Sequence, residues 1–327
     1  MRYWRFHEYG DLSNLRLEVG PRPVPGNGEV LLRVAFAALN PADALTVRGL
    51  YPRTAPPPLV VGRDGAGTIE EAAIAGKFTV GDRVIILRGE VGVTRDGTLA
   101  EYCTVPETLL APLPDGWTLE EGAAGPLVLL TAWRALVDIG KLSKGQTVFV
   151  NGASGGVGTA TVMLAHALGA RVVAGSRSTE KRDRLKALGA DIVVDSTKPD
   201  SMEADVLNAL NGGRCDIVVE NLGGAYLQSS LNVLAEGGCI GVVGLLDGFL
   251  SELSLGHLIF KRARIEGVAV GAYSPEQAQD AWTRIVGSLR TTGAKPIIDS
   301  VLPFDDVQEA FTRLSRGPMG KVLVRVD

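Results

Sequence analysis

A short glycine-rich stretch near the middle of the chain, Asn151 to Gly158, constrains the fold more than any other segment. An apolar run at residues 147–150 precedes it, and a helical run at residues 157–168 follows it. Further short β-branched runs then alternate with helical segments as far as residue 243. This alternation is typical of βαβ units, which build a parallel sheet buried on both faces. We therefore expect an α/β fold with a Rossmann-type, doubly wound parallel sheet.

The segments on either side of this block have a different pattern. Residues 1 to 120 or so are rich in strand-forming runs and turns, and the three prolines Pro56–Pro58 exclude a helix interior there because they supply no backbone donors. Near residue 265 the pattern shifts again, and an apolar run closes the chain. We therefore expect the Rossmann domain, at residues 123–265, to be inserted into a discontinuous β-rich domain made of residues 1–122 and 266–327.

The composition excludes several classes of protein. Hydrophobic residues make up 46% and charged residues 21% of the chain, a balance typical of a folded globular protein. The net charge is −4 and no long basic run occurs, so we expect neither nucleic acid nor an anionic membrane as a partner. No apolar stretch reaches the roughly 20 residues that a membrane span needs. The first residues are charged and the three cysteines form no CxxC pair, so we expect a cytoplasmic location.

The glycine-rich stretch matches the dinucleotide-binding fingerprint, with alanine in the first glycine position. In that fingerprint the first residue permits a tight turn, the second brings the backbone close to a pyrophosphate, and the third lets the helix pack against the sheet. Free amides at the helix N-terminus would hold the phosphates. A glycine turn without a ligand could share this spacing, but the position between a strand and a helix favours a dinucleotide. The predicted contacts are Ala153, Ser154, Gly155, Gly156, Val157 and Gly158.

The residues after the second predicted strand, which ends near Gly175, distinguish NADPH from NADH. An NAD site usually has an Asp or Glu about 20 residues beyond the fingerprint, where it accepts from the ribose hydroxyls. No acid stands at this strand end, and Ser176, Arg177 and Lys181 could instead supply donors and positive charge to a 2′-phosphate. A solvated helix start is the alternative explanation for Arg177 and Lys181. We predict NADPH as the cofactor.

The whole chain resembles the medium-chain dehydrogenase/reductases, and within them the zinc-independent quinone oxidoreductases of the zeta-crystallin type. The landmarks, in chain order, are Asn40-Pro41-Ala42-Asp43, Arg48-Gly49-Leu50-Tyr51-Pro52, Gly62-Arg63-Asp64-Gly65-Ala66-Gly67, Gly81-Asp82-Arg83-Val84, Gly97-Thr98-Leu99-Ala100-Glu101-Tyr102, Thr131-Ala132, the turn at 151–158, Ala187-Leu188-Gly189-Ala190 and Gly320-Lys321-Val322-Leu323-Val324. The resemblance implies that the β-rich domain is GroES-like and catalytic. It also implies a homodimer that meets through edge strands, for which residues 265–270 are the candidate segment.

The zinc alcohol dehydrogenases of this family differ from the chain at the metal positions. They have Cys-x-x-Asp where this chain has Asn40-Pro41-Ala42-Asp43, and Gly-His-Glu where it has Gly62-Arg63-Asp64. Neither Asn40 nor Arg63 suits a tetrahedral zinc site built on thiolate and imidazole. The closely spaced cysteines of the structural zinc lobe are absent too. We predict no metal.

Without zinc, oxidation of an unactivated alcohol lacks the ion that would stabilise the alkoxide. Reduction of a quinone or enone needs less charge stabilisation from the protein, since the acceptor delocalises the developing negative charge itself. By resemblance, Asn40 and Tyr51 are the catalytic candidates and Thr131 a nicotinamide contact; Val243, Gly244 and Lys321 are further cofactor candidates. Quinone reductases of this type carry a second tyrosine where Leu45 stands, so the resemblance does not determine the identity of the acceptor. The alternatives are a 2-enoyl thioester reductase and a non-enzymatic NADPH-binding protein.

Overall fold

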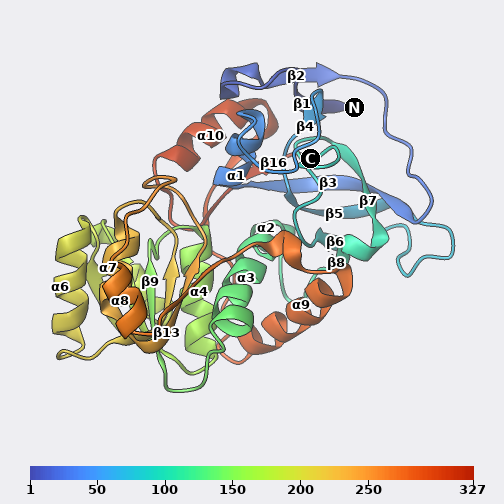
Figure 1. The fold of residues 1–327 in the computed structure, drawn as a ribbon. Helices are drawn as coiled ribbons and strands as arrows, with labels where there is room; N and C mark the ends of the chain where they lie inside the picture. The colour runs from blue at the N-terminus through green and yellow to red at the C-terminus, as the bar shows by residue number, and fades with distance from the viewer. The chain divides into compact units, whose positions relative to one another are not determined.

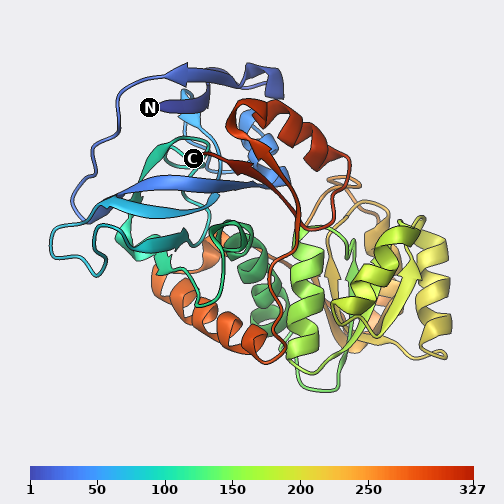
Figure 2. The same cartoon turned by 180° about the vertical axis from the view of Figure 1, so that it is seen from behind.

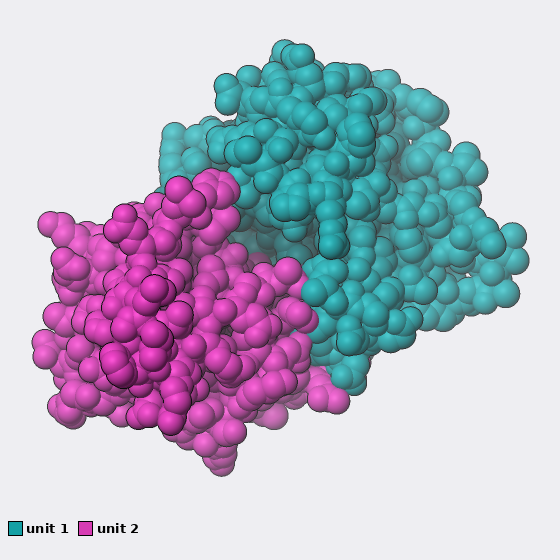
Figure 3. Space-filling model, in the orientation of Figure 1, with its two compact units in different colours: residues 1–127, 271–282, 295–327 teal, residues 128–270, 283–294 magenta.

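The structure is a computed structural model that describes residues 1–327. It divides into two compact units, coloured separately in Figure 3. Unit 1 comprises residues 1–127, 271–282 and 295–327, and unit 2 comprises residues 128–270 and 283–294. Two helices, α3 (Pro126–Trp133) and α9 (Pro275–Arg290), have residues in both units.

Unit 1 is built on a seven-stranded sheet, and its core is formed by the apolar side chains that alternate along these strands. The strand order is β15-β16-β3-β5-β6-β8, and β7 also pairs with β3. The strands are β3 (Glu29–Leu39), β5 (Asp64–Glu71), β6 (Arg83–Ile86), β7 (Tyr102–Pro106), β8 (Leu110–Pro112), β15 (Ile298–Pro303) and β16 (Lys321–Arg325). β16 joins β3 antiparallel, so the last residues of the chain lie beside its first long strand (Figures 1 and 2).

A second, three-stranded sheet and short helices complete unit 1. The sheet has the order β2-β1-β4, with β1 (Arg2–Phe6), β2 (Arg16–Val19) and β4 (Leu59–Val60). The helices include α1 (Pro41–Val47), α2 (Leu119–Ala124) and α10 (Val307–Ser315). α2 begins with a capping box: the Glu121 backbone N–H donates to the Thr118 hydroxyl, and the Thr118 N–H donates to the Glu121 carboxylate.

Unit 2 contains a six-stranded sheet in which every pairing is parallel. Its order, β11-β10-β9-β12-β13-β14, is the 3-2-1-4-5-6 order of a Rossmann fold. The strands are β9 (Thr147–Asn151), β10 (Arg171–Ser176), β11 (Ile192–Asp195), β12 (Cys215–Glu220), β13 (Leu234–Val242) and β14 (Arg264–Gly267). The chain leaves β9 towards β10 on one side and reaches β12 on the other, so the carboxyl ends of β9 and β12 form the topological switch point where ligands bind in such sheets.

Helices cover both faces of this sheet, which confirms the predicted doubly wound arrangement. α4 (Gly156–Ala167) packs on β9 and β10 and lies in front of the sheet in Figure 2. α7 (Tyr226–Val233) packs on β12 and β13 and lies in front of it in Figure 1. The remaining helices are α5 (Thr179–Ala187), α6 (Pro199–Ala209), α8 (Leu255–Phe260) and the π-helix η3 (Arg134–Ile139) that follows α3.

Candidate functional site

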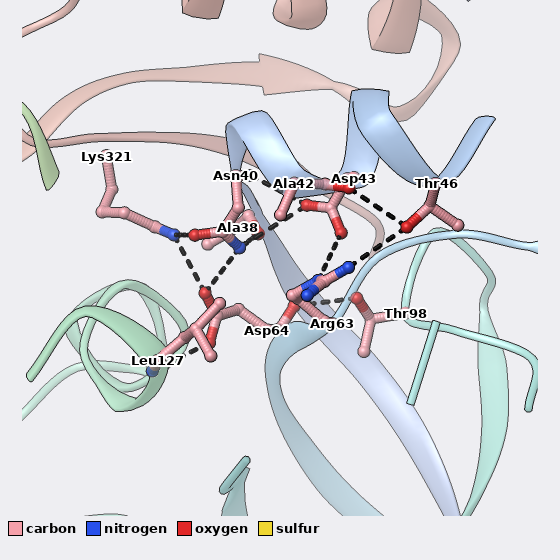
Figure 4. A network of polar contacts seen from close by, with 10 residues as sticks. All are labelled: Ala38, Asn40, Ala42, Asp43, Thr46, Arg63, Asp64, Thr98, Leu127 and Lys321. Carbon is pink, nitrogen blue, oxygen red and sulfur yellow. Dashed lines mark hydrogen bonds and ion pairs between the residues drawn. The ribbon is translucent and has the colours of Figure 1, made fainter. Parts of the chain in front are cut away.

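A buried polar network lies in unit 1 where β3 ends and α1 begins (Figure 4). Asn40 follows the last residue of β3 and is the N-cap of α1, and Pro41 occupies the first helical position, where a missing N–H costs nothing. Asp43, one turn on, accepts a hydrogen bond from the Asn40 backbone N–H at 2.8 Å. The Asn-x-x-Asp spacing therefore fixes the strand-to-helix corner and brings both side chains to one place.

Arg63 and Asp43 form a buried ion pair within this network. The Arg63 Nε donates to Asp43 Oδ1 at 3.1 Å, and neither side chain has appreciable solvent exposure. Arg63 Nη2 also donates to the Thr46 hydroxyl at 3.1 Å, and its guanidinium lies 4.2 Å from the ring centroid of Tyr51. Burial lowers the pKa of Arg63, but Asp43 and Tyr51 outweigh it and leave this pKa above its ordinary value. Arg63 is therefore a permanently charged member of the site.

Asp64 is the centre of the other half of the network. Its Oδ2 accepts from the Lys321 Nζ at 2.9 Å and from the Asn40 Nδ2 at 2.9 Å, and its Oδ1 accepts from the Leu127 backbone N–H at 3.2 Å. Lys321 Nζ also donates to Asn40 Oδ1 at 2.6 Å. Figure 4 shows Lys321, Asn40 and Asp64 turned towards one another. A residue from the final strand thus completes a cluster that starts 281 positions earlier in the sequence.

Three of the predicted site residues lie in unit 1, and the structure brings two of them together. Asn40 and Lys321 are hydrogen-bonded partners, and both are buried. Tyr51 is half-buried and contacts the network through Arg63. The remaining predicted residues lie in unit 2, and they are Thr131, the turn at 153–158, Ser176, Arg177, Lys181, Val243 and Gly244.

The glycine-rich turn of unit 2 connects β9 to α4. Gly152 has φ +67°, a conformation that favours glycine, and Gly155 is the N-cap of α4. A Cβ on Gly158 would lie 2.3 Å from the Gly152 carbonyl oxygen and 2.6 Å from Ala153 Cα, so only glycine permits this approach of helix and turn. A Cβ on Gly155 would meet nothing closer than the Gly152 oxygen at 3.7 Å. The two glycines therefore differ: packing demands Gly158, whereas the protein itself leaves room at Gly155.

Ser176 is the last residue of β10 and is buried, whereas Arg177, which follows it, is exposed. The Ser176 hydroxyl accepts from the Ser178 N–H at 3.4 Å, and Ser178 in turn caps α5 by accepting from the Lys181 N–H at 3.4 Å. No carboxylate stands at the end of β10. The acid at the end of the neighbouring strand, Asp195, is bound by Arg182 and Thr197.

Two groups at the switch point were not among the predicted residues. Glu220, the last residue of β12, is fully buried and accepts from the Asn151 side-chain amide at 3.0 and 3.2 Å, from the Leu222 and Gly223 amides, and from the Ser230 hydroxyl. Burial raises the pKa of Glu220. The hydrogen bonds that it accepts favour the charged form and lower this pKa, but the effect of burial is larger. The position directly after a β-branched run, at the carboxyl end of a parallel strand, is the signal that could have identified Glu220 from the sequence.

Asn221 is the second group. Its Nδ2 donates to the Asn151 carbonyl at 2.7 Å, and its Oδ1 is buried without a hydrogen-bond partner. A buried acceptor without a donor costs free energy, and such a group at a switch point suits a ligand that supplies the donor. Val243 and Gly244, which follow β13, donate their amides to the Glu220 carbonyl at 2.8 and 3.3 Å. The loop after β13 is thereby tied to the end of β12.

Two further observations concern metal and membrane. No group of three or more His, Cys, Asp or Glu side chains has an arrangement that could hold a metal ion. The positions that hold zinc ligands in the zinc alcohol dehydrogenases are occupied by Asn40 and Arg63, which are both engaged in the hydrogen bonds described above. None of the helices combines the length and the apolarity that crossing a membrane demands.

Two family models match the chain. The alcohol dehydrogenase GroES-like domain matches residues 26–115, and the zinc-binding dehydrogenase model matches residues 156–287. The acryloyl-coenzyme A reductase of Sulfurisphaera tokodaii is 34% identical, over 97% of this chain and 98% of the relative. The chain belongs to the medium-chain dehydrogenase/reductase family. Within this family it is of the zeta-crystallin type, since the human quinone oxidoreductase is 28% identical over 99% of this chain and 97% of its own.

Solved structures of the medium-chain family agree with the fold. A structure described as an NAD-dependent alcohol dehydrogenase matches with a TM-score of 0.90 and 32% identity and covers 100% of both chains. The mycobacterial protein Rv1454c, solved in complex with NADPH, matches with a TM-score of 0.89 and 26% identity over 100% of both chains. The parallel sheet and the β-rich GroES-like unit are therefore those of a medium-chain reductase, and the chain is an oxidoreductase whose fold binds a nicotinamide cofactor.

Proposed function

We propose that the chain is an NADPH-dependent reductase that transfers hydride to a quinone or an α,β-unsaturated carbonyl compound without zinc. One observation carries this proposal: each carboxylate of the unit 1 network is paired with a buried cation and accepts further hydrogen bonds. Asp43 binds Arg63 and the Asn40 amide, and Asp64 binds Lys321, Asn40 and Leu127. The paired cations make both carboxylates poor bases for the proton of an alcohol, so the site suits reduction of an acceptor that carries its own electron sink.

The residues of unit 2 fit a dinucleotide. The first helical amides of α4 have no carbonyl one turn back, and the open space at Gly155 allows a pyrophosphate to approach the backbone. The unpartnered Oδ1 of Asn221 could accept from a hydroxyl or amide of the ligand. We assign Thr131, Val243 and Gly244 to the nicotinamide side of this site on the family resemblance. When bound, a reduced nicotinamide supplies the hydride.

We assign the 2′-phosphate of NADPH to Ser176, Arg177 and Lys181. The absence of an acid at the end of β10 and the exposed guanidinium of Arg177 support this assignment. The NADPH complex of Rv1454c supports the assignment as well. The NAD-dependent alcohol dehydrogenase, which also matches the fold, is named for the other coenzyme.

The coenzyme preference is tested by Arg177→Ala. A hydrogen bond to a charged group contributes about 1.5–3 kcal/mol, so the KM for NADPH should rise roughly 10- to 100-fold. The KM for NADH should not change, because NADH lacks the phosphate. Arg184→Ala, which removes an exposed arginine within α5, is the matched control and should leave both values unchanged. Equal shifts for the two coenzymes would contradict the assignment.

One finding favours a second class of acceptor, the 2-enoyl thioesters. The acryloyl-coenzyme A reductase has a higher identity, 34%, than the human quinone oxidoreductase, 28%. The test is NADPH oxidation followed by absorbance with benzoquinone, phenanthrenequinone, methyl vinyl ketone and crotonyl-CoA. Turnover of the first three supports the proposal, and exclusive turnover of crotonyl-CoA supports the thioester reductase. Tight NADPH binding without turnover of any of the four compounds would support the non-enzymatic NADPH-binding protein.

We also propose that the chain forms a homodimer through β14. This strand is the last of the sheet, and Arg264 and Glu266 on it are exposed. An antiparallel pairing of two copies about Ile265 would set each Arg264 opposite the Glu266 of the other copy, a favourable cross-strand pair. Glu266→Arg should therefore shift the sedimentation coefficient towards the monomer, and Arg264→Glu with Glu266→Arg should restore the dimer. A monomeric wild-type protein would refute the pairing.

A further inference from the structure

Lys321 holds a positive charge in the interior of unit 1. Its side chain is only 3% exposed, and it lies at the first position of β16, beside β3. An ammonium group has three N–H donors. Two of them are used, towards Asn40 Oδ1 and Asp64 Oδ2 (Figure 4). One N–H of a buried cation is thus left for another acceptor.

Asn40, the neighbouring candidate for a hydrogen-bond donor, has no donor to spare. Its Nδ2 donates to Asp64 at 2.9 Å, and the other contacts of this nitrogen are with Ala38 O at 3.4 Å and Asp43 Oδ2 at 3.5 Å. The Lys321 bond to Oδ1 fixes which end of the amide faces which partner. What Asn40 can still offer is a lone pair of Oδ1, which suits a ligand hydroxyl and does not suit a carbonyl oxygen. Asn40 is therefore less suited than Lys321 to polarise the acceptor.

The charges of the network also favour Lys321. Two cations, Arg63 and Lys321, face two carboxylates, Asp43 and Asp64, so the cluster is neutral as it stands. Arg63 is occupied by Asp43, Thr46 and the ring of Tyr51. A charged donor makes a hydrogen bond roughly twice as strong as a neutral one. Negative charge that develops on an oxygen beside Lys321 would be met by a cation already held in position, at no cost of reorganisation.

We propose that the Lys321 ammonium donates its third N–H to the acceptor oxygen on which negative charge develops, and that Asn40 and Asp64 are its positioning residues. This rests on the proposed reduction of quinones or enones. Hydride, with its electron pair, adds to a carbon of the acceptor, the conjugated π electrons move to oxygen, and NADPH becomes NADP⁺. Lys321 binds the resulting oxyanion until a proton from water neutralises it. This role differs from the cofactor contact that the family resemblance implies for Lys321.

The first test compares Lys321→Met and Lys321→Arg with the wild type. Loss of one oxyanion donor lowers kcat by roughly 10²–10³-fold in other enzymes, so Lys321→Met should lose about 100-fold in kcat. Lys321→Arg should recover part of the loss, since it keeps a cation. The Kd for NADPH, measured by fluorescence titration, should stay within about threefold in both variants. Lys144→Met, at an exposed lysine of unit 2, is the matched control and should behave as wild type.

The second test needs no turnover. 4-Nitrophenol, titrated spectroscopically in the presence of enzyme and NADP⁺, is the probe, because its phenolate oxygen is a stable analogue of the proposed oxyanion. An adjacent opposite charge lowers the pKa of an acid by about one or more, so the bound phenol should ionise at a lower pH in the wild type than in Lys321→Met. A role confined to folding would not move this spectrum. Equal ionisation in the two proteins would overturn the proposal.

Three further outcomes have a defined meaning for the proposal. If Lys321→Met does not fold because Asp64 is left unpaired, Lys321→Met with Asp64→Asn removes both charges of the pair and takes its place. If a Lys321 variant has a raised Kd for NADPH and an unchanged kcat, Lys321 binds the cofactor and does not stabilise the oxyanion. This result would overturn the proposal. Wild-type enzyme that turns over none of the quinones or enones refutes the proposed function, whereas the nitrophenol titration still reports on Lys321 separately.

Discussion

Gly158→Ala is expected to destabilise unit 2 and to weaken NADPH binding more than tenfold. The new Cβ would lie 2.3 Å from the Gly152 oxygen and 2.6 Å from the carbonyl carbon and Cα of Ala153. All three atoms belong to the backbone, so no side chain can rotate away and α4 must shift from the turn. Overpacking of this kind costs about 1–3 kcal/mol, of which the better helix propensity of alanine offsets about 0.5–1 kcal/mol. Urea unfolding and NADPH fluorescence titration measure the two effects.

Gly155→Ala is the matched control three residues earlier. Its φ of −73° suits alanine, and its Cβ would meet only the Gly152 oxygen, at 3.7 Å. The free energy of unfolding should therefore change by less than about 0.5 kcal/mol. NADPH affinity should still fall about tenfold or more, because the added methyl group occupies the space through which the pyrophosphate would approach the backbone. Unchanged affinity in Gly155→Ala would show that the phosphates bind elsewhere.

Local sequence patterns predicted five of the six strands of unit 2, β9 to β13, and the helices α4, α5 and α6. Short β-branched runs that alternate with helices predicted a parallel sheet with helices on both faces, and β9 to β13 confirm it, whereas β14 lies beyond the predicted alternation. The capping box at Thr118 and Glu121 is a local feature of the same kind, because its two hydrogen bonds join residues three positions apart. Such features depend on spacing along the chain, which a single sequence displays directly.

The polar networks could not be predicted in the same way. Asn151 and Glu220 meet because β9 and β12 are neighbours, yet they are 69 positions apart, and periodicity does not give the order of strands in a sheet. Lys321 and Asp64 are 257 positions apart and meet because β16 and β5 both pair with β3. The sequence identified Asn40 and Arg63 as departures from the zinc ligands. Which carboxylate each of them binds depends on the tertiary structure.

The buried Arg63–Asp43 pair has the second large expected effect. Arg63→Met keeps much of the side-chain volume but leaves Asp43 buried without its cation. Breaking a buried pair from one side costs about 3–5 kcal/mol, and urea unfolding at neutral pH should show a loss of this size. Arg63→Met with Asp43→Asn removes both charges and should recover at least half of it. If the single and double variants are equally unstable, packing around Arg63, and not its charge, holds this corner together.

The effect of Arg63→Met should also depend on pH. Burial already raises the pKa of Asp43, and Arg63 is the largest of the influences that oppose this rise. Without Arg63 the folded-state pKa rises further above the unfolded-state value. Such a group contributes stability that is fully present below its unfolded pKa and is lost as pH rises through its folded pKa. The difference in unfolding free energy between wild type and Arg63→Met should therefore be smaller at about pH 5 than at about pH 8, and a difference independent of pH would contradict a charged Asp43 as its cause.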